Sequence, residues 1–184
     1  MRYLLDSNTI SELYDTEVSH HSAILEHLGA LTDRDQVCIS VLSLYELEYG
    51  WANAPDKKKP AVRQVIADVQ NDFEVLPLSV QGAVVFGALK KRIKDLRDPS
   101  KENMKKFNVD LMLAATALAS DCCLVSADRM YRELQQYDAS FKLRNWTVHI
   151  EHEGDILQKT AGLLKRKKID PLKFQADQRA KQDE

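Results

Sequence analysis

Short apolar runs alternate along the chain with longer stretches that repeat every three to four residues. The runs at 37–40 and 122–125 show no polar–apolar alternation, which predicts strands buried on both faces. The stretch 41–54 instead has Leu44, Leu47 and Trp51 at helical intervals. On these patterns the predicted strands are 2–5, 37–40, 73–78, 122–125 and 146–150, and the predicted helices are about 10–14, 20–31, 41–54, 60–72, 79–96, 109–120 and 129–136.

The order strand, turn, helix recurs, and units of this kind form a mostly parallel sheet with helices on both faces. The fold class is therefore α/β, a three-layer α/β/α arrangement around a central, mostly parallel sheet. The helix at 109–120 is apolar on every side, which predicts that it lies inside the protein. Because 184 residues suit a single core, we assign 1–150 to one domain and 151–184, with an amphipathic stretch before Pro171, to a helical or partly disordered C-terminal extension.

Four acidic residues lie where predicted strands end or the following helices begin. Asp6 and Asp128 each end a strand, whereas Glu46 and Asp110 lie near the starts of helices. In a parallel sheet, the carboxyl ends of the strands and the amino ends of the following helices meet at one edge, where ligands of α/β folds bind. The four side chains are therefore expected to converge.

Each of these acids also has a purely structural explanation, because acids at helix starts satisfy free N–H groups and complement the helix dipole. Residues 43–46 even fit a capping box. Capping does not require four acids in one place, however, and two carboxylates about 4 Å apart repel by about 4 kcal/mol at an effective dielectric near 20. A cation would relieve this repulsion, and an all-oxygen ligand set without nearby His or Cys favours Mg²⁺ or Mn²⁺ over zinc.

The segments around the four acids are LLDSN at 4–8, SLYELEYG at 43–50, NVDLMLAATAL at 108–118 and LVSAD at 124–128. In order and spacing they resemble the motifs of the PIN-domain nucleases, most closely the VapC-type toxin ribonucleases of prokaryotic toxin–antitoxin pairs. The resemblance covers about residues 1–150. Ser126 stands where Thr is commoner in the family, a change that keeps the hydroxyl, whereas residues 94–107 and the tail after 150 are longer than a compact member would have.

The resemblance implies an endoribonuclease that depends on Mg²⁺ or Mn²⁺, cleaves RNA and has a cognate antitoxin as partner. A homodimer is possible and is left open. A metal held by carboxylates can orient and acidify a water, so no nucleophilic side chain is required. The residues matching the family motifs are the catalytic acids Asp6, Glu46, Asp110 and Asp128, of which Asp6, Asp110 and Asp128 are expected to bind metal, with Asn8 and Ser126 orienting them.

The net charge of −2 argues against a generally basic nucleic-acid binder, but the charge is unevenly distributed. Residues 87–107 hold eight basic and three acidic residues, and this stripe leads into the Asp110 motif. Lys101, Lys105 and Lys106 could therefore bind RNA phosphates beside the acids, or they could simply be solvent-exposed charges at a helix end and in a loop. The short basic runs at 57–59 and 165–168 are more simply explained as solvent-exposed helix ends. Tyr45, Tyr49 and Trp51 could stack on bases, although Trp51 has the spacing of a core residue.

Several other classes are disfavoured. Three cysteines without a pairing framework predict reduced core residues, and the absence of an apolar run near 20 residues predicts a cytoplasmic, non-membrane protein. A phosphatase with Asp6 as nucleophile would need a second acid where Asn8 stands. A non-catalytic RNA-binding module would be expected to lack one of the four acids. An RNA-processing nuclease outside a toxin–antitoxin pair remains open, and His149 with His152 is better explained as charged surface than as a metal site.

Overall fold

Five short parallel strands form the centre of the computed structural model, which describes residues 1–97 and 105–150. The strands are β1 (Arg2–Leu5), β2 (Gln36–Ser40), β3 (Glu74–Leu76), β4 (Cys122–Val125) and β5 (Leu143–Arg144), and their order in the sheet is β3-β2-β1-β4-β5. β1 lies in the middle, where Leu5 is in register with Ile39 of β2 and with Val125 of β4. The predicted α/β class and the parallel sheet are confirmed.

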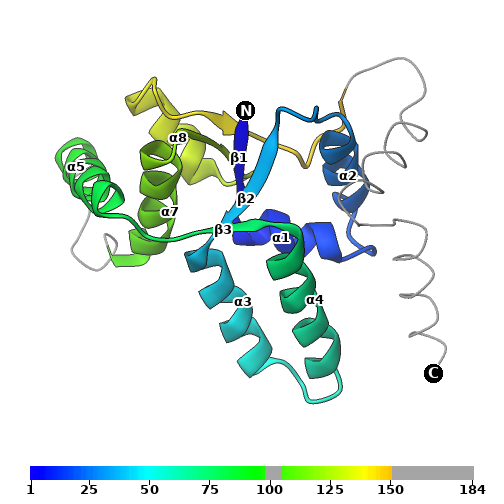
Figure 1. Ribbon diagram of the computed structural model, residues 1–184. Helices are drawn as coiled ribbons and strands as arrows, with labels where there is room; N and C mark the ends of the chain where they lie inside the picture. Colours follow the sequence, from blue (N-terminus) through cyan, green and yellow to red (C-terminus); the bar gives the residue numbers. More distant parts are fainter. Residues whose placement is uncertain (98–104, 151–184) are drawn as a thin grey trace.

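Helices cover both faces of this sheet, as the strand side chains require. Leu4 belongs to one core cluster together with α5 (Val80–Arg97), α7 (Asn108–Ala119) and α8 (Arg129–Tyr137). The next residue, Leu5, belongs to the opposite cluster together with α1 (Ser7–Tyr14), α2 (His21–Gly29) and α4 (Lys59–Asp72). Successive strand residues point to opposite faces of the sheet, and both of these leucines are fully buried. Both faces of the sheet are therefore covered, which confirms the predicted three layers (Figure 1).

The predicted buried helix is α7. Its residues Leu111, Ala114 and Ala117 are inaccessible to solvent, since α7 lies between the sheet and α5. No helix in the described part of the chain is long and apolar enough to cross a bilayer. The three cysteines are buried and free, as predicted; the sulfur atoms of Cys38 and Cys122 are 3.9 Å apart.

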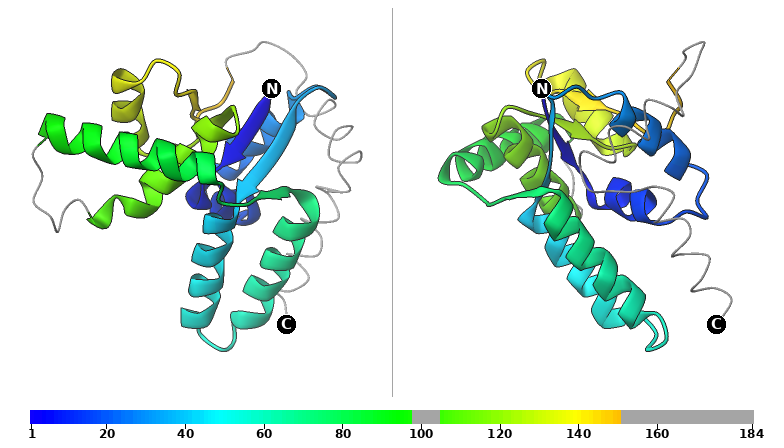
Figure 2. Two further views of the ribbon diagram at one scale, coloured as in Figure 1. Left: turned by 60° about the vertical axis from the view of Figure 1, so that its left-hand side comes forward. Right: turned by 45° about the vertical axis from the view of Figure 1, so that its right-hand side comes forward.

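The helices α3 (Val41–Asn53) and α4 extend together away from the sheet as a hairpin (Figures 1 and 2). The guanidinium carbon of Arg63 lies 4.0 Å from the centre of the Trp51 ring, and its Nη1 forms an ion pair with Glu48 at 2.7 Å. Trp51 is therefore half-buried under α4 rather than part of either core cluster, contrary to the core placement that its spacing suggests.

Two local predictions are wrong. The last strand is β5 and not 146–150; Trp146 is buried against Tyr3, with ring centres 5.2 Å apart, so its apolar character reflects packing rather than pairing. Ser43 is not the N-cap of α3, because the helix begins earlier and the hydroxyl of Ser40 accepts from the Leu42 amide. The capping box predicted at 43–46 is therefore absent. The predicted extension at 151–184 lies outside the described residues.

Candidate active site

Asp6 and Asp128 both lie at the carboxyl edge of the sheet. β1 and β4 are adjacent, and the Asp6 amide donates to the Val125 carbonyl at 3.1 Å. Each carboxylate caps the helix that follows it: Oδ1 of Asp6 accepts from the Thr9 amide at 2.6 Å, and Oδ1 of Asp128 accepts from the Met130 amide at 2.7 Å. The capping role predicted for these acids is thus real, and it fixes where their carboxylates lie.

The other two acids reach the same place from helices. Asp110 is in the first turn of α7, and Glu46 is in the second turn of α3, the helix that follows β2. All four carboxylates line one small pocket of about 30 Å³, together with Asn8. The predicted convergence is therefore present, and we call Asp6, Glu46, Asp110 and Asp128 the acid quartet.

The acid quartet is an uncompensated cluster of negative charge. Burial, followed by the charges of Asp128, Glu46 and Asp6, raises the pKa of Asp110 above its ordinary value. Burial also raises the pKa of Asp6, although hydrogen bonds from Ser126 and Thr9 oppose this. Among residues 1–97 and 105–150, no lysine, arginine or histidine forms an ion pair with any member of the quartet.

Ser126 connects two of these acids. Its side chain is 1% exposed, hydrogen-bonds to the carboxylate of Asp6, and accepts at Oγ from the Asp128 amide at 3.1 Å. The hydroxyl is thus in a position to hold both residues in place. Asn8 is exposed at the rim of the pocket.

Tyr131 of α8 also lines the pocket, and nothing in the sequence patterns singled it out. Its ring is 3% exposed and packs against Phe141, with ring centres 6.3 Å apart. Burial and then the four charges of the acid quartet raise the pKa of its phenol, so the hydroxyl remains a neutral hydrogen-bond donor. Its position three residues after Asp128, on the first turns of the helix that Asp128 caps, is the signal that could have identified it.

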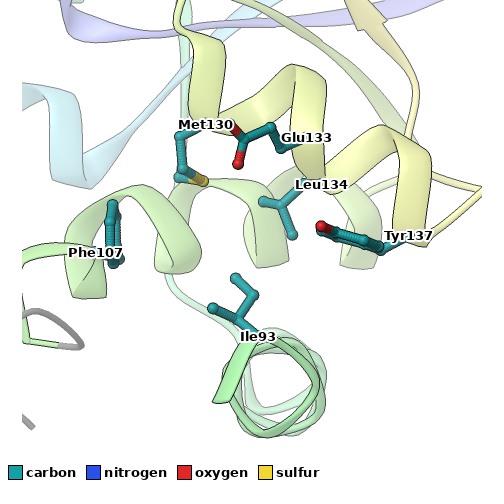
Figure 3. Close-up of a pocket in the computed structure, with 6 residues that line it drawn as sticks. All are labelled: Ile93, Phe107, Met130, Glu133, Leu134 and Tyr137. Carbon is teal, nitrogen blue, oxygen red and sulfur yellow. The ribbon is translucent and has the colours of Figure 1, made fainter. Parts of the chain in front are cut away.

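A second, apolar pocket lies beside α8. Figure 3 shows Met130 and Leu134 of α8 facing Phe107 and Ile93 across an apolar pocket of about 10 Å³. These side chains pack α8 against α5 and the start of α7, whereas Tyr131 of the same helix lines the acidic pocket. The pocket in Figure 3 is too small and too apolar to be a second candidate site.

Of the three predicted phosphate-binding lysines, the structure describes two. Lys105 and Lys106 are exposed just before α7, and Lys101 lies outside the described residues. Lys90, in the same basic stripe, donates to Oδ1 of Asn108 at 2.7 Å, so it holds α5 to the start of α7. His149 pairs with Glu26 of α2 at 2.6 Å, in keeping with a surface rather than a metal-binding role, and the second histidine of that pair, at 152, lies outside the described residues.

The acid quartet suits a hard divalent cation that keeps part of its water shell. Within the described ranges, no group of three or more His, Cys, Asp or Glu side chains is arranged so that it could hold a metal ion directly. The four acids instead surround the pocket from four segments, and Mg²⁺ is commonly held by one or two carboxylates and several waters. Oxygen donors and unneutralised negative charge, which contributes to the raised pKa of Asp110, are the features that a hard divalent cation requires.

The fold and the acid-lined edge of the sheet agree with the comparison to known families. The model of the PIN domain family matches residues 3–136, and the chain belongs to this family. A search of curated proteins gave no match.

Solved structures of the same fold include members of VapBC, a family of toxin–antitoxin systems. A chain of VapBC-1 from nontypeable Haemophilus influenzae superposes with a TM-score of 0.65 at 22% identity, covering 80% of this chain and 100% of that one. A chain of VapBC2 from Rickettsia felis, bound to a DNA fragment from its promoter, gives 0.60 at 22% identity, with 79% and 99% covered. FitAcB from Neisseria gonorrhoeae gives 0.61 at 21% identity, with 78% and 97% covered.

Proposed function

We propose that this chain is an endoribonuclease that depends on Mg²⁺ or Mn²⁺ and acts as the toxin of a toxin–antitoxin pair. The observation that carries the proposal is the acid quartet: four carboxylates from four separate segments line one pocket with no cationic side chain of the described residues paired to them. Such a cluster costs stability, and capping accounts for only two of its members.

In this proposal Asp6 and Asp110 bind the metal directly, and Asp128 binds the same ion or a second one. Glu46, which is exposed on α3, holds a ligand water or positions the attacking water. When bound, a divalent ion supplies an acidified water and neutralises charge on the phosphate that is being cleaved.

The residues around the acid quartet have supporting roles. Ser126 holds Asp6 and Asp128 in a fixed relation through its hydroxyl, and Asn8 offers an amide at the rim. Lys105 and Lys106 contribute positive charge beside the pocket, where the substrate phosphates would lie. None of these interactions requires a covalent enzyme intermediate.

The toxin role draws support from the kind of complexes that share the fold, VapBC and FitAcB. A free nuclease would damage cellular RNA, so an inhibitor is expected. An antitoxin segment that places Arg or Lys in the acidic pocket would compensate the charge as a metal does, because guanidinium binds carboxylates in a bidentate manner.

Two measurements test the proposal. Purified wild-type protein should cleave a structured RNA in Mn²⁺, and Asp110→Asn should abolish most of this activity while leaving the fold intact, because Asn keeps the shape but not the charge. An Asp110→Asn variant that cuts at the wild-type rate would refute the metal site.

The second measurement is growth after induction of the chain alone, compared with Asp6→Ala expressed to the same level. We expect the wild type to inhibit growth and the variant not to. Equal growth, together with RNA cleavage in vitro, would replace the toxin by an RNA-processing nuclease of the same family.

A further inference from the structure

The exposed aromatic side chains of the described residues are confined to one helix. Of all Phe, Trp and Tyr residues in the ranges 1–97 and 105–150, Tyr45 and Tyr49 alone are exposed, at 71% and 74%. Both lie on α3, one turn apart. Large aromatic rings are usually buried, so two largely exposed rings on one helix suggest that this surface binds a ligand.

These two rings continue directly from the acidic pocket. Leu42 and Glu46 of α3 line that pocket, and Tyr45 and Tyr49 each follow one of them by three residues. Residues three and four apart share one side of a helix, so the tyrosines lie on the pocket side of α3, at increasing distance from the sheet. We call this surface, formed by Tyr45, Tyr49 and the exposed residues between and beyond them on α3, the tyrosine face.

The fold does not use the tyrosine face. The opposite side of α3 carries Leu44 and Leu47 into the core, and Trp51 packs under Arg63 of α4. The remainder of the tyrosine face is open: a Cβ added at Gly50 would meet no atom within 4 Å, and Ala52 and Asn53 are small and exposed.

The chemistry of the tyrosine face favours nucleic-acid bases over an apolar protein segment. It has aromatic rings, which offer flat faces to a base, but no large exposed aliphatic side chain that an apolar protein segment would bury. Four helical residues separate the rings by about 6 Å along the axis, which exceeds the ~3.4 Å rise of stacked nucleotides, so each ring would hold a separate, unstacked base.

Exposed lysines occur in two segments connected to this region. Lys57 and Lys58 lie in the loop that joins α3 to α4, which Figure 1 shows at the tip of the hairpin, and Lys105 and Lys106 lie just before α7, whose first turn carries Asp110. A single strand leaving the pocket along α3 would thus meet rings for its bases and lysines for its phosphates, the combination typical of single-strand binding.

We propose that the tyrosine face is a base-stacking subsite for single-stranded RNA, in which Tyr45 and Tyr49 hold two nucleotides beside the phosphate that is cleaved. The proposal rests on the proposed ribonuclease function. It assigns to α3 a role in choosing unpaired RNA, since bases in a duplex are not free to stack on protein rings.

The test measures binding of a short single-stranded RNA in Ca²⁺, chosen to occupy the metal site with little turnover. Tyr45→Ala and Tyr49→Ala should each weaken binding about tenfold, because a base–aromatic stack is worth about 1–3 kcal/mol. Tyr45→Phe and Tyr49→Phe keep the ring and should bind as the wild type does. Val84→Ala, at an exposed apolar position of α5, is the control for loss of surface area.

A matched change in the RNA makes the test specific. Removing the base, but not the ribose, at the nucleotide that a given tyrosine holds should weaken wild-type binding by a similar factor and should not weaken binding by the Ala variant further. If the Ala variants lose as much affinity for abasic RNA as for intact RNA at every position tested, the proposal is overturned.

Unchanged RNA binding by both Ala variants would also overturn it. If these variants instead lose self-association in sedimentation, the tyrosine face is an interface between copies of the chain. If the wild type neither binds nor cleaves RNA, the proposed function itself fails, which is a different result.

Discussion

Oδ1 of Asp6 accepts the amide hydrogen of Thr9 at 2.6 Å, so one carboxylate both caps α1 and lines the acidic pocket. These two roles can be separated. Asp6→Asn keeps an oxygen that can accept from Thr9, and Asp6→Ala removes it, which should lower the free energy of unfolding by about 1 kcal/mol relative to Asn.

Both Asp6 variants should nevertheless lose RNA cleavage, because neither carries the charge that a metal requires. Urea unfolding and cleavage rates, measured on the same preparations, check this. Retained activity in Asp6→Asn would show that Asp6 is a cap and nothing more.

Asp110→Asn should make the metal-free protein more stable while it removes activity. Burial and three neighbouring carboxylates raise the pKa of Asp110, so the folded state holds this proton more tightly than the unfolded chain does. The ionised form therefore costs stability, fully so above the raised pKa. We expect a melting temperature a few degrees above that of the wild type at neutral pH, since about 1 kcal/mol shifts a domain of this size by ~2–4 °C.

The same reasoning fixes the pH dependence. As pH falls through the raised pKa of Asp110 toward the ordinary value of 3.8, the wild type takes up the proton and the cost disappears. The advantage of Asp110→Asn should therefore shrink on acidification. An advantage that is constant with pH would mean that charge repulsion is not its cause.

Added Mg²⁺ or Mn²⁺ should stabilise the wild type, because a ligand that binds only the folded state shifts the unfolding equilibrium. At a concentration about 100-fold above Kd the gain is about 2.7 kcal/mol. Protons compete for Asp6 and Asp110, whose pKa values are both raised, so the gain should decline as pH falls. Differential scanning fluorimetry with Asp110→Asn as the control tests this; a shift with zinc alone would place the metal elsewhere.

Tyr131→Phe should slow cleavage about two- to tenfold, the loss expected for one neutral hydrogen bond of about 0.5–1.5 kcal/mol. The hydroxyl faces the acid quartet and stays protonated, so it can donate to a water or to a phosphate oxygen in the pocket. Because the ring remains packed on Phe141, the melting temperature should change little. Tyr137→Phe, on another side of α8, should leave kcat unchanged; equal effects of both variants would argue against a role for Tyr131.

Replacing Lys101, Lys105 and Lys106 with Gln should weaken RNA binding and flatten its dependence on salt. For single-stranded RNA, each phosphate that the protein no longer neutralises lowers the slope of log K against log[salt] by about 0.7, so three such phosphates change it by about two units. Lys142→Gln is the control, because Lys142 pairs with Asp121 at 2.6 Å beside the start of β4, at the opposite edge of the sheet. An unchanged slope would remove these lysines from the RNA-binding surface.

The repeating pattern of the chain was sufficient to predict the strands near the middle of the sheet and the buried helix α7. It failed at one edge of the sheet, where β5 is only two residues long and its register is set by pairing with β4. It placed the start of α3 correctly but also offered a capping box at 43–46, since Ser40 and Ser43 are equally good caps as residue types and the end of β2 decides between them. Edge pairing and the choice of a capping residue depend on neighbours that are distant in sequence.

Local sequence was enough to place each acid at the end of a strand or near the start of a helix, because parallel strand–helix units impose a single edge on such residues. Which other groups share that edge depends on the tertiary structure. The packing of α8 in the same core cluster as α7 brings the phenol of Tyr131 to the acids, and the packing of Trp51 under Arg63 fixes which side of α3 remains open. Neither can be read from local periodicity, because each depends on contacts between helices whose relative position is set by the whole core.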